Sequence, residues 1–227
     1  MADLGVIFDM DGVLVDSYRA HFRSWNKMAH SVGLNMTEEQ FAATFGRTTQ
    51  DIIRHLWGEK FPPETDLSVW DDRKEAAYRE ILREGFPAMD GAAELLAALH
   101  EAGFRLAIGS SGPPENVALV AELLPGAEHV AATVTGREVA RGKPDPEVFL
   151  KAAAKLGVPP PNCAVVEDAP AGVEAARRAG MTAVGLTGTA GREVLAERAH
   201  LVVDSLRELS PQRIAELIRQ AGEQGRT

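Results

Sequence analysis

Two aspartates, Asp9 and Asp11, stand two positions apart directly after the apolar segment 5–8. The segment predicts a buried strand, and the Asp-Met-Asp-Gly sequence at its end predicts a tight turn. Two carboxylates crowded at the end of a buried strand repel each other unless a cation compensates them, and Mg²⁺ is the kind of hard cation that carboxylates bind. The alternative is a surface turn whose aspartates cap the next helix.

Three other places in the sequence carry residues suited to anion or metal chemistry. Ser110 and Ser111 offer hydroxyls and backbone N–H groups to an anion, Lys143 lies in a loop restricted by two prolines, and Glu167 and Asp168 end an apolar segment. Each alone has a plain alternative, namely a loop, a solvated charge or a pair of helix-capping carboxylates. Together, each at or just after a predicted strand end, they have the composition of a metal-dependent phosphoryl-transfer site.

Predicted strands and helices alternate over most of the chain. The strands fall at 5–8, 105–109, 130–134, 163–166, 182–186 and 201–203, and the helices at 90–102, 116–124, 145–156, 171–179 and 211–222. Pro146 suits the first turn of its helix. The alternation predicts an α/β fold with a parallel sheet between two layers of helices, and such sheets bind ligands at the carboxyl ends of their strands.

The segment 17–86 differs from the rest because it contains no convincing strand. Its predicted helices are 17–32, 37–44, 48–56 and 67–83, and the segment 37–40 has the spacing of a capping box. All three tryptophans, both tyrosines and five of the eight phenylalanines lie in it. We therefore expect a helical domain with its own core, inserted into an α/β domain formed by 1–16 and 87–227.

The composition limits the classes of function. At 227 residues, with 45% hydrophobic and 25% charged residues, the chain suits one large globular domain with an insert. A net charge of −9 argues against a nucleic-acid or anionic-membrane binder. The one cysteine, Cys163, lies in a predicted buried strand and cannot form an internal disulfide, which favours the cytoplasm. We find neither a signal peptide nor a membrane span and expect a monomer.

The four motifs in order resemble those of the haloacid dehalogenase (HAD) superfamily, whose core is Rossmann-like. The matching segments are Phe8-Asp9-Met10-Asp11-Gly12-Val13, Ser110, Gly142-Lys143-Pro144-Asp145-Pro146 and Val166-Glu167-Asp168-Ala169-Pro170-Ala171-Gly172. The helical insert is similar to the cap of the β-phosphoglucomutase-like branch, which includes many phosphatases of sugar phosphates and other small metabolites. The resemblance implies a small phosphorylated metabolite as the partner.

The resemblance also implies roles for the core residues. Asp9 would be the nucleophile that forms an aspartyl-phosphate, and Asp11 the general acid and base. Ser110, Ser111 and Lys143 would bind the phosphoryl oxygens.

The same resemblance implies that Mg²⁺ is the cofactor. Asp9, the backbone carbonyl of Asp11 and Asp168 would hold the ion, and Glu167 would support it. Because the dehalogenases and phosphonatases of the superfamily lack an aspartate at the position of Asp11, phosphate esters are the expected substrates.

In the cap, the resemblance points to His21, Lys74 and Arg47 as residues near the substrate. Mutases carry an arginine for the distal phosphate of a sugar bisphosphate at the position that we align with Thr49. Threonine does not replace it, which leaves open whether the nearby Arg47 does. The expected function is a phosphatase, and the alternatives are a β-phosphoglucomutase and a non-catalytic phosphate-binding protein.

Overall fold

The computed structural model describes residues 3–44 and 49–224. The chain folds into two compact units, one formed by Met1–Asp16 together with Pro87–Thr227 and the other by Ser17–Phe86. We call the first unit the core and the second the cap.

A six-stranded sheet, parallel throughout, forms the centre of the core. Its strands lie in the order β3-β2-β1-β4-β5-β6. The strands are β1 (Gly5–Phe8), β2 (Arg105–Gly109), β3 (Val130–Val134), β4 (Cys163–Glu167), β5 (Thr182–Leu186) and β6 (Leu201–Val203). The order reverses between β1 and β4, and this reversal is the place where open α/β sheets bind ligands.

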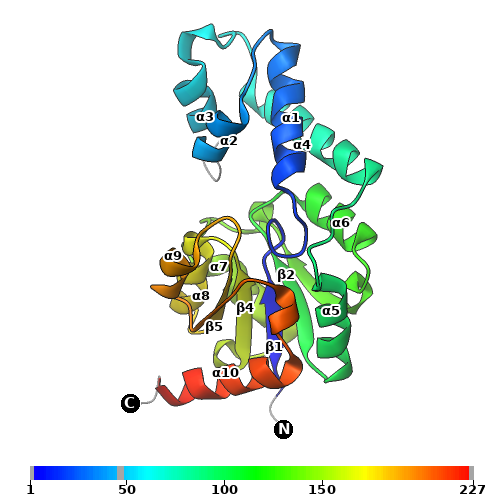
Figure 1. Cartoon of the computed structure of the whole chain (residues 1–227), viewed down its shortest axis with the longest axis vertical. Helices are drawn as coiled ribbons and strands as arrows, with labels where there is room; N and C mark the ends of the chain where they lie inside the picture. Colours follow the sequence, from blue (N-terminus) through cyan, green and yellow to red (C-terminus); the bar gives the residue numbers. More distant parts are fainter. Residues whose placement is uncertain (1–2, 45–48, 225–227) are drawn as a thin grey trace. The chain divides into compact units, whose positions relative to one another are not determined.

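Helices cover both faces of this sheet (Figure 1). They are α5 (Ala92–Glu101), α6 (Pro114–Leu123), α7 (Glu147–Leu156), α8 (Pro170–Arg178), α9 (Arg192–Ala196) and α10 (Pro211–Gln224). Ile7, Ala107 and Val165 of the strands pack with Phe149 of α7 and Val173 of α8 in one buried cluster. Helix α5 contacts β2, and α10 contacts β4 and β5. The predicted α/β fold with a parallel sheet between helices is confirmed.

The structure differs from the sequence prediction at two helices. Pro146 is not in the first turn of α7 but caps it, and the Asp145 carboxylate accepts a hydrogen bond from the Glu147 N–H at 3.1 Å. Helix α9 was not predicted because five residues are too few to show a helical period. Short 3₁₀ turns also connect the elements; they are η1 (Gly58–Lys60), η2 (Ala127–His129), η3 (Gly136–Glu138), η4 (Pro160–Asn162) and η5 (Leu206–Glu208).

The described residues of the cap form helices joined by turns and loops, and none of them forms a strand. Its helices are α1 (Tyr18–Ser31), α2 (Glu38–Thr44), α3 (Thr49–Leu56) and α4 (Leu67–Glu84). The predicted capping box is present, because Thr37 and Gln40 exchange hydrogen bonds between side chain and backbone at 2.9 and 3.2 Å. An aromatic cluster fills the cap's own core, with Trp25, Trp57 and Trp70 in contact through their rings.

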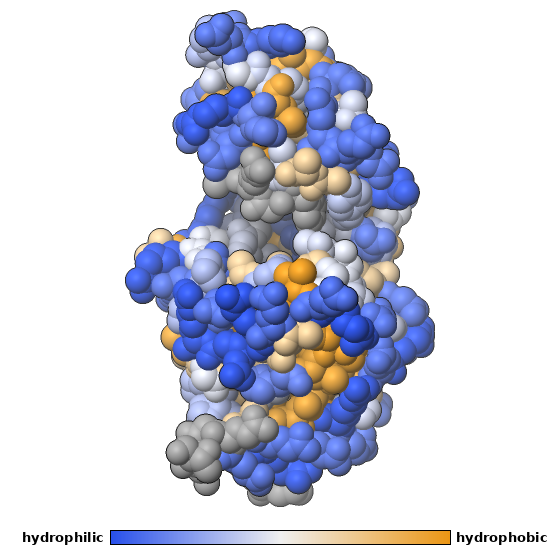
Figure 2. Space-filling view, turned by 60° about the vertical axis from the view of Figure 1, so that its left-hand side comes forward, coloured by the Kyte–Doolittle hydropathy of each residue, from blue (hydrophilic) through white to orange (hydrophobic). Residues whose placement is uncertain are grey.

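Most of the surface visible in Figure 2 is hydrophilic, with smaller apolar areas between. Among residues 3–44 and 49–224, no helix is both long and apolar enough to cross a membrane.

Candidate active site

The candidate carboxylates of the core lie just after β1 and at the end of β4, the two strands between which the sheet order reverses. Phe8 pairs with Val166, and the Asp9 N–H donates to the Val166 carbonyl at 3.0 Å. Asp9 therefore leaves β1 beside Glu167, the last residue of β4, and Asp168 follows. The parallel register brings together carboxylates that are more than 150 residues apart in the chain.

Lys143 joins two of these carboxylates. Its Nζ donates to Asp9 Oδ1 at 2.6 Å and to Glu167 Oε1 at 2.7 Å. The side chains of all three residues are almost fully buried. Asp9, Glu167 and Asp168 each offer a carboxylate oxygen, and these oxygens lie within 4.8 Å of one another. Three buried carboxylates thus surround a single ammonium group.

This imbalance changes the pKa values of the site. Burial, helped by the charge of Glu167, raises the pKa of Asp9 to about 7 although Lys143 opposes the shift. Burial and the charges of Glu167 and Asp9 raise the pKa of Asp168 to about 8. Burial also disfavours the charged form of Lys143, but Asp9 and Glu167 outweigh it and raise the pKa of the ammonium. The lysine stays charged, and one cation does not compensate the carboxylates.

Two glycines make room for the carboxylates. A Cβ on Gly172 would lie 1.7 Å from Glu167 Oε1, and a Cβ on Gly12 would lie 2.0 Å from Asp168 Oδ2. Gly12 also has a φ of +79°, a conformation that other residues seldom adopt. No other residue type fits at either position without displacing a carboxylate.

The loop after β2 places the predicted serines differently from each other. Ser110 is buried, and its Oγ accepts from the Gly112 N–H at 2.9 Å. Ser111 is exposed. A Cβ on Gly112 would stand 3.2 Å from Ser110 Oγ and 4.0 Å from Asp11 Oδ2, so the Asp11 carboxylate and the Ser110 hydroxyl face the same small space. This is the arrangement needed for a phosphoryl binder beside an acid.

Sequence reasoning missed Thr189 as a contact of the site. It lies in the loop after β5, and its hydroxyl donates to Asp168 Oδ2. The neighbouring Thr187 donates instead to Asp204 at 2.9 Å. Two threonines around a glycine carry no signal that separates these two roles, so only the structure identifies the contact.

The predicted residues of the cap form a polar cluster inside that unit. Lys74 is 5% exposed, so it is a buried side chain of the cap and not a solvated helix charge. Its Nζ lies 3.0 Å from His21 Nδ1 and donates to Glu75 at 2.7 Å. The His21 ring stacks on Tyr78, with 4.1 Å between centroids. Arg47 lies outside the described residues.

Cys163 is not part of the candidate site. It is buried in β4, and burial raises the pKa of its thiol to about 12, which makes it a core residue.

Residues 4–180 match the family model described as haloacid dehalogenase-like hydrolase, and the chain belongs to this family. The chain is 36% identical over 206 residues to hexitol phosphatase A of Escherichia coli, covering 91% of this chain and 93% of the relative. It is 31% identical to β-phosphoglucomutase of Bacillus subtilis over 187 residues, covering 80% and 82%.

Solved structures show the same fold. A HAD hydrolase of family IA, variant 3, from Entamoeba histolytica has a TM-score of 0.83 and 28% identity, covering 96% of this chain and 100% of that one. The family, the relatives and the site agree that the chain is a HAD-type hydrolase with the features of a phosphohydrolase.

We predict that Gly172→Ala inactivates the enzyme, because the new methyl group displaces Glu167 and with it Lys143. We expect at least a hundredfold loss in the hydrolysis of p-nitrophenyl phosphate, in line with the effect of small misplacements in catalytic sites. The matched control is Gly142→Ala next to Lys143, where a Cβ meets nothing within 4 Å. Equal activities of the two variants would contradict this account of Gly172.

We also predict a pH-dependent effect of Asp168→Asn on stability in the presence of EDTA. The pKa of Asp168 is raised to about 8, so the native state holds a proton there that the unfolded state releases near pH 4. Stability conferred by this proton is lost as pH rises toward 8, whereas asparagine stays neutral. Between pH 5 and 8, the free energy of unfolding in urea should rise by at least about 1 kcal/mol for the variant relative to the wild type.

Comparison with the variant removes from this measurement the titration of groups that do not interact with Asp168. His200, for example, has a pKa lowered by burial, so its titration makes stability rise with pH, and it does so in both proteins. A stability difference that does not change with pH would show that Asp168 is ionised across the range.

Proposed function

We propose that the protein is a Mg²⁺-dependent phosphatase of small phosphorylated metabolites, in particular sugar and polyol monophosphates, that acts through an aspartyl-phosphate on Asp9. The observation that carries the proposal is the buried group of Asp9, Glu167 and Asp168 around Lys143, placed where the sheet order reverses.

The donor set of the core fits a divalent cation. Carboxylate oxygens are hard ligands, and burial together with the neighbouring carboxylates raises the pKa values of Asp9 and Asp168 although Lys143 opposes the shift, which supports the binding of a further cation. Asp9 and Asp168 would hold Mg²⁺ with the backbone carbonyl of Asp11, and Glu167 would support it. Bound Mg²⁺ supplies positive charge against the phosphoryl oxygens and favours the ionised form of the carboxylates.

The chain's own residues divide the reaction between them. Asp9 attacks phosphorus and forms the aspartyl-phosphate, which separates one difficult displacement into two easier ones. Asp11 protonates the leaving oxygen and then takes a proton from the water that hydrolyses the intermediate. Ser110, Ser111 and Lys143 bind the phosphoryl oxygens, with Lys143 held in place by Asp9 and Glu167.

The polar cluster of the cap supports a role in substrate choice. Lys74 and His21 are held by Glu75 and Tyr78, so their polar atoms are ordered within the cap. Arg47 completes the set that we propose for substrate contact. A hexitol phosphatase among the relatives favours a polyol or sugar phosphate.

A sugar-phosphate mutase is the second candidate, because β-phosphoglucomutase is also a relative. Thr49 argues against it. Its hydroxyl donates to the Asp71 carboxylate at 2.6 Å, so this position presents an acidic partner and no cation to a second phosphate. A phosphatase needs only one phosphate group on its substrate.

We infer further that the protein works in the cytoplasm as a monomer whose partner is a small metabolite. Support comes from the buried thiol of Cys163, which suits a reducing compartment, and from the acidic net charge of −9, which disfavours nucleic acid and anionic membranes.

We predict that Asp9→Asn lowers the turnover of phosphate esters by at least about a thousandfold, because the amide is no nucleophile. The matched control is Asp16→Asn, an exposed residue of the same segment, which should keep wild-type turnover. The substrates tested are hexitol phosphates, hexose 6-phosphates and β-glucose 1-phosphate primed with its 1,6-bisphosphate. With the wild type, free phosphate from one or a few esters supports the phosphatase, and glucose 6-phosphate without free phosphate supports the mutase. Full turnover by Asp9→Asn would contradict the assignment of Asp9 as the nucleophile.

We predict that Thr189→Val weakens Mg²⁺ binding by about ten- to a hundredfold, because the Asp168 carboxylate loses the hydroxyl that orients it. Isothermal titration of the protein with Mg²⁺ measures this effect without substrate. Thr189→Ser should keep the wild-type affinity, and so should Thr187→Val, whose hydroxyl contacts Asp204. The same affinity in Thr189→Val and Thr187→Val would show that the Thr189 hydroxyl does not position Asp168.

A further inference from the structure

Lys143 has a third neighbour besides the carboxylates of Asp9 and Glu167. Its Nζ lies over the ring of Phe149, 4.9 Å from the ring centroid. An ammonium within about 6 Å of a ring centroid is attracted by the negative face of the ring, and the attraction is stronger where water is excluded. The Lys143 side chain is 10% exposed and Phe149 is fully buried, so the contact is of this stronger kind.

The core holds the Phe149 ring in place. A Cβ on Gly109, the last residue of β2, would lie 3.1 Å from Phe149 Cδ1 and 3.3 Å from Ile7 Cγ2. The ring therefore packs directly against the backbone of β2, at the residue before Ser110. Helix α7, which carries Phe149, contacts β1, β2 and β3. The ring is thus a fixed surface next to the ammonium.

The two hydrogen bonds of Lys143 do not by themselves fix its ammonium. Distances of 2.6 Å to Asp9 Oδ1 and 2.7 Å to Glu167 Oε1 place Nζ on a circle about the line that joins the two oxygens. The Phe149 ring is a third contact, and it selects one part of that circle. Within residues 3–44 and 49–224, no third acceptor contacts Nζ. Because an ammonium has three donors, one N–H is left for a phosphoryl oxygen.

The ring contact is also the one that the proposed reaction leaves unchanged. One carboxylate oxygen of Asp9 forms a bond to phosphorus, the bond from phosphorus to the ester oxygen breaks, and the leaving oxygen takes the proton of Asp11. The Asp9 carboxylate loses its negative charge in this step, so its attraction for Lys143 weakens. Phe149 takes no part in bond making, and its ring face attracts the ammonium equally before and after the step.

We propose that Phe149 is a positioning residue, whose ring face holds the Lys143 ammonium against the phosphoryl group while Asp9 changes from carboxylate to aspartyl-phosphate. The inference rests on the proposed function, in which Lys143 binds the phosphoryl oxygens. It gives a role in the reaction to a residue without a polar side-chain atom, six positions after Lys143 in the chain.

The test replaces Phe149 with 4-fluoro-, 3,5-difluoro- and 3,4,5-trifluorophenylalanine. Each fluorine withdraws charge from the ring face and changes the size of the ring little, so the series weakens the attraction while the packing is kept. We expect kcat/KM for p-nitrophenyl phosphate to fall with each fluorine, by about tenfold over the series. A residue that only fills space would show no such graded fall.

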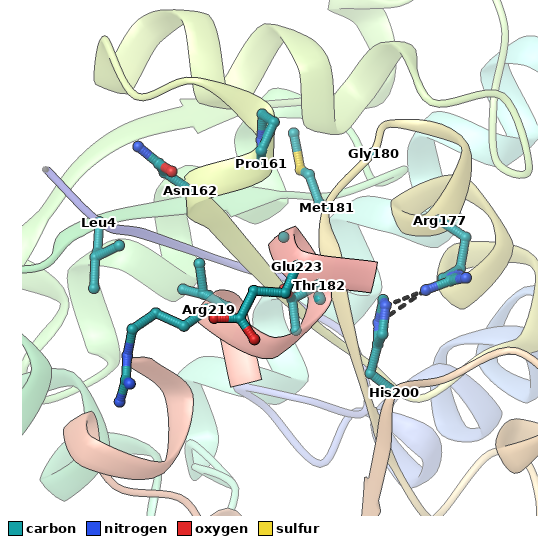
Figure 3. A pocket seen from close by; sticks show the side chains of 13 residues that line it. Leu4, Pro161, Asn162, Arg177, Gly180, Met181, Thr182, His200, Arg219 and Glu223 are labelled. Atoms are coloured by element: carbon teal, nitrogen blue, oxygen red, sulfur yellow. Dashed lines mark hydrogen bonds between the residues drawn. The ribbon is translucent and has the colours of Figure 1, made fainter. Parts of the chain in front are cut away.

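Phe104 supplies the matched control. It is buried and directly precedes β2, whereas Gly109 ends that strand. It therefore lies at the opposite end of the sheet, where Leu4 and Thr182 line a cavity of about 740 Å³ (Figure 3). Its ring takes part in none of the cation–π contacts of the described chain. The same three substitutions at Phe104 should leave kcat/KM unchanged.

A second arm measures the contact without catalysis. Urea unfolding is followed for the Phe149 series in the wild type and in Lys143→Met, which keeps a side chain of similar length and removes its charge. The free energy of unfolding should fall with each fluorine relative to the same substitution in Lys143→Met, because the difference between the two backgrounds isolates the pairwise interaction.

A graded fall of both kcat/KM and the free energy of unfolding, present only with Lys143 and absent from the Phe104 series, supports the proposal. An active enzyme whose kcat/KM does not change along the Phe149 series would overturn the role of Phe149 alone, even if the free energy of unfolding falls. Absence of hydrolysis by the wild type would overturn the proposed function and this role with it.

Discussion

The grouping of three buried carboxylates around one lysine is the constraint on which the core depends. Taking several negative charges out of water costs several kcal/mol for each ion unless partners compensate them. Lys143 compensates part of this charge through bonds of 2.6 and 2.7 Å to Asp9 and Glu167. Backbone N–H groups also help, since Ala169 donates to the second oxygen of Glu167 at 2.8 Å. No further cation of the described chain contacts these carboxylates, and burial together with their mutual repulsion raises the pKa values of Asp9 and Asp168, which is the cost expected of a site kept for chemistry at the expense of stability.

The parallel sheet is what makes this grouping possible. Asp9 and Glu167 meet only because β1 and β4 are neighbours in parallel register, and each strand ends at the same edge. Both strands are fully buried, so their register is fixed by packing on two faces. Gly12 and Gly172 then permit contacts that any Cβ would prevent. The fold, the register of the strands and the absence of a Cβ at Gly12 and Gly172 together position the carboxylate oxygens.

The strands, the helices, the insert and the place of the site could be predicted from the sequence for a physical reason. Strand and helix periods are local, so the elements and the insert follow from short windows, and a parallel sheet brings its strand ends together whatever the loops do. Contacts made by single loop residues do not follow. Thr189 and Thr187 are alike in sequence, yet one contacts Asp168 and the other Asp204. The burial of Lys74 also depends on packing of α1 against α4, which no local pattern encodes.

On the proposed function, the two units separate the reaction from the choice of substrate. Each unit has its own apolar core, built on the sheet in one and on the tryptophan cluster in the other. Two polar contacts lie within the cap, from the Thr49 hydroxyl to Asp71 and from Lys74 to Glu75. The relatives named hexitol phosphatase A and β-phosphoglucomutase are consistent with the proposal that one core chemistry serves different substrates through changes in a cap that has its own core.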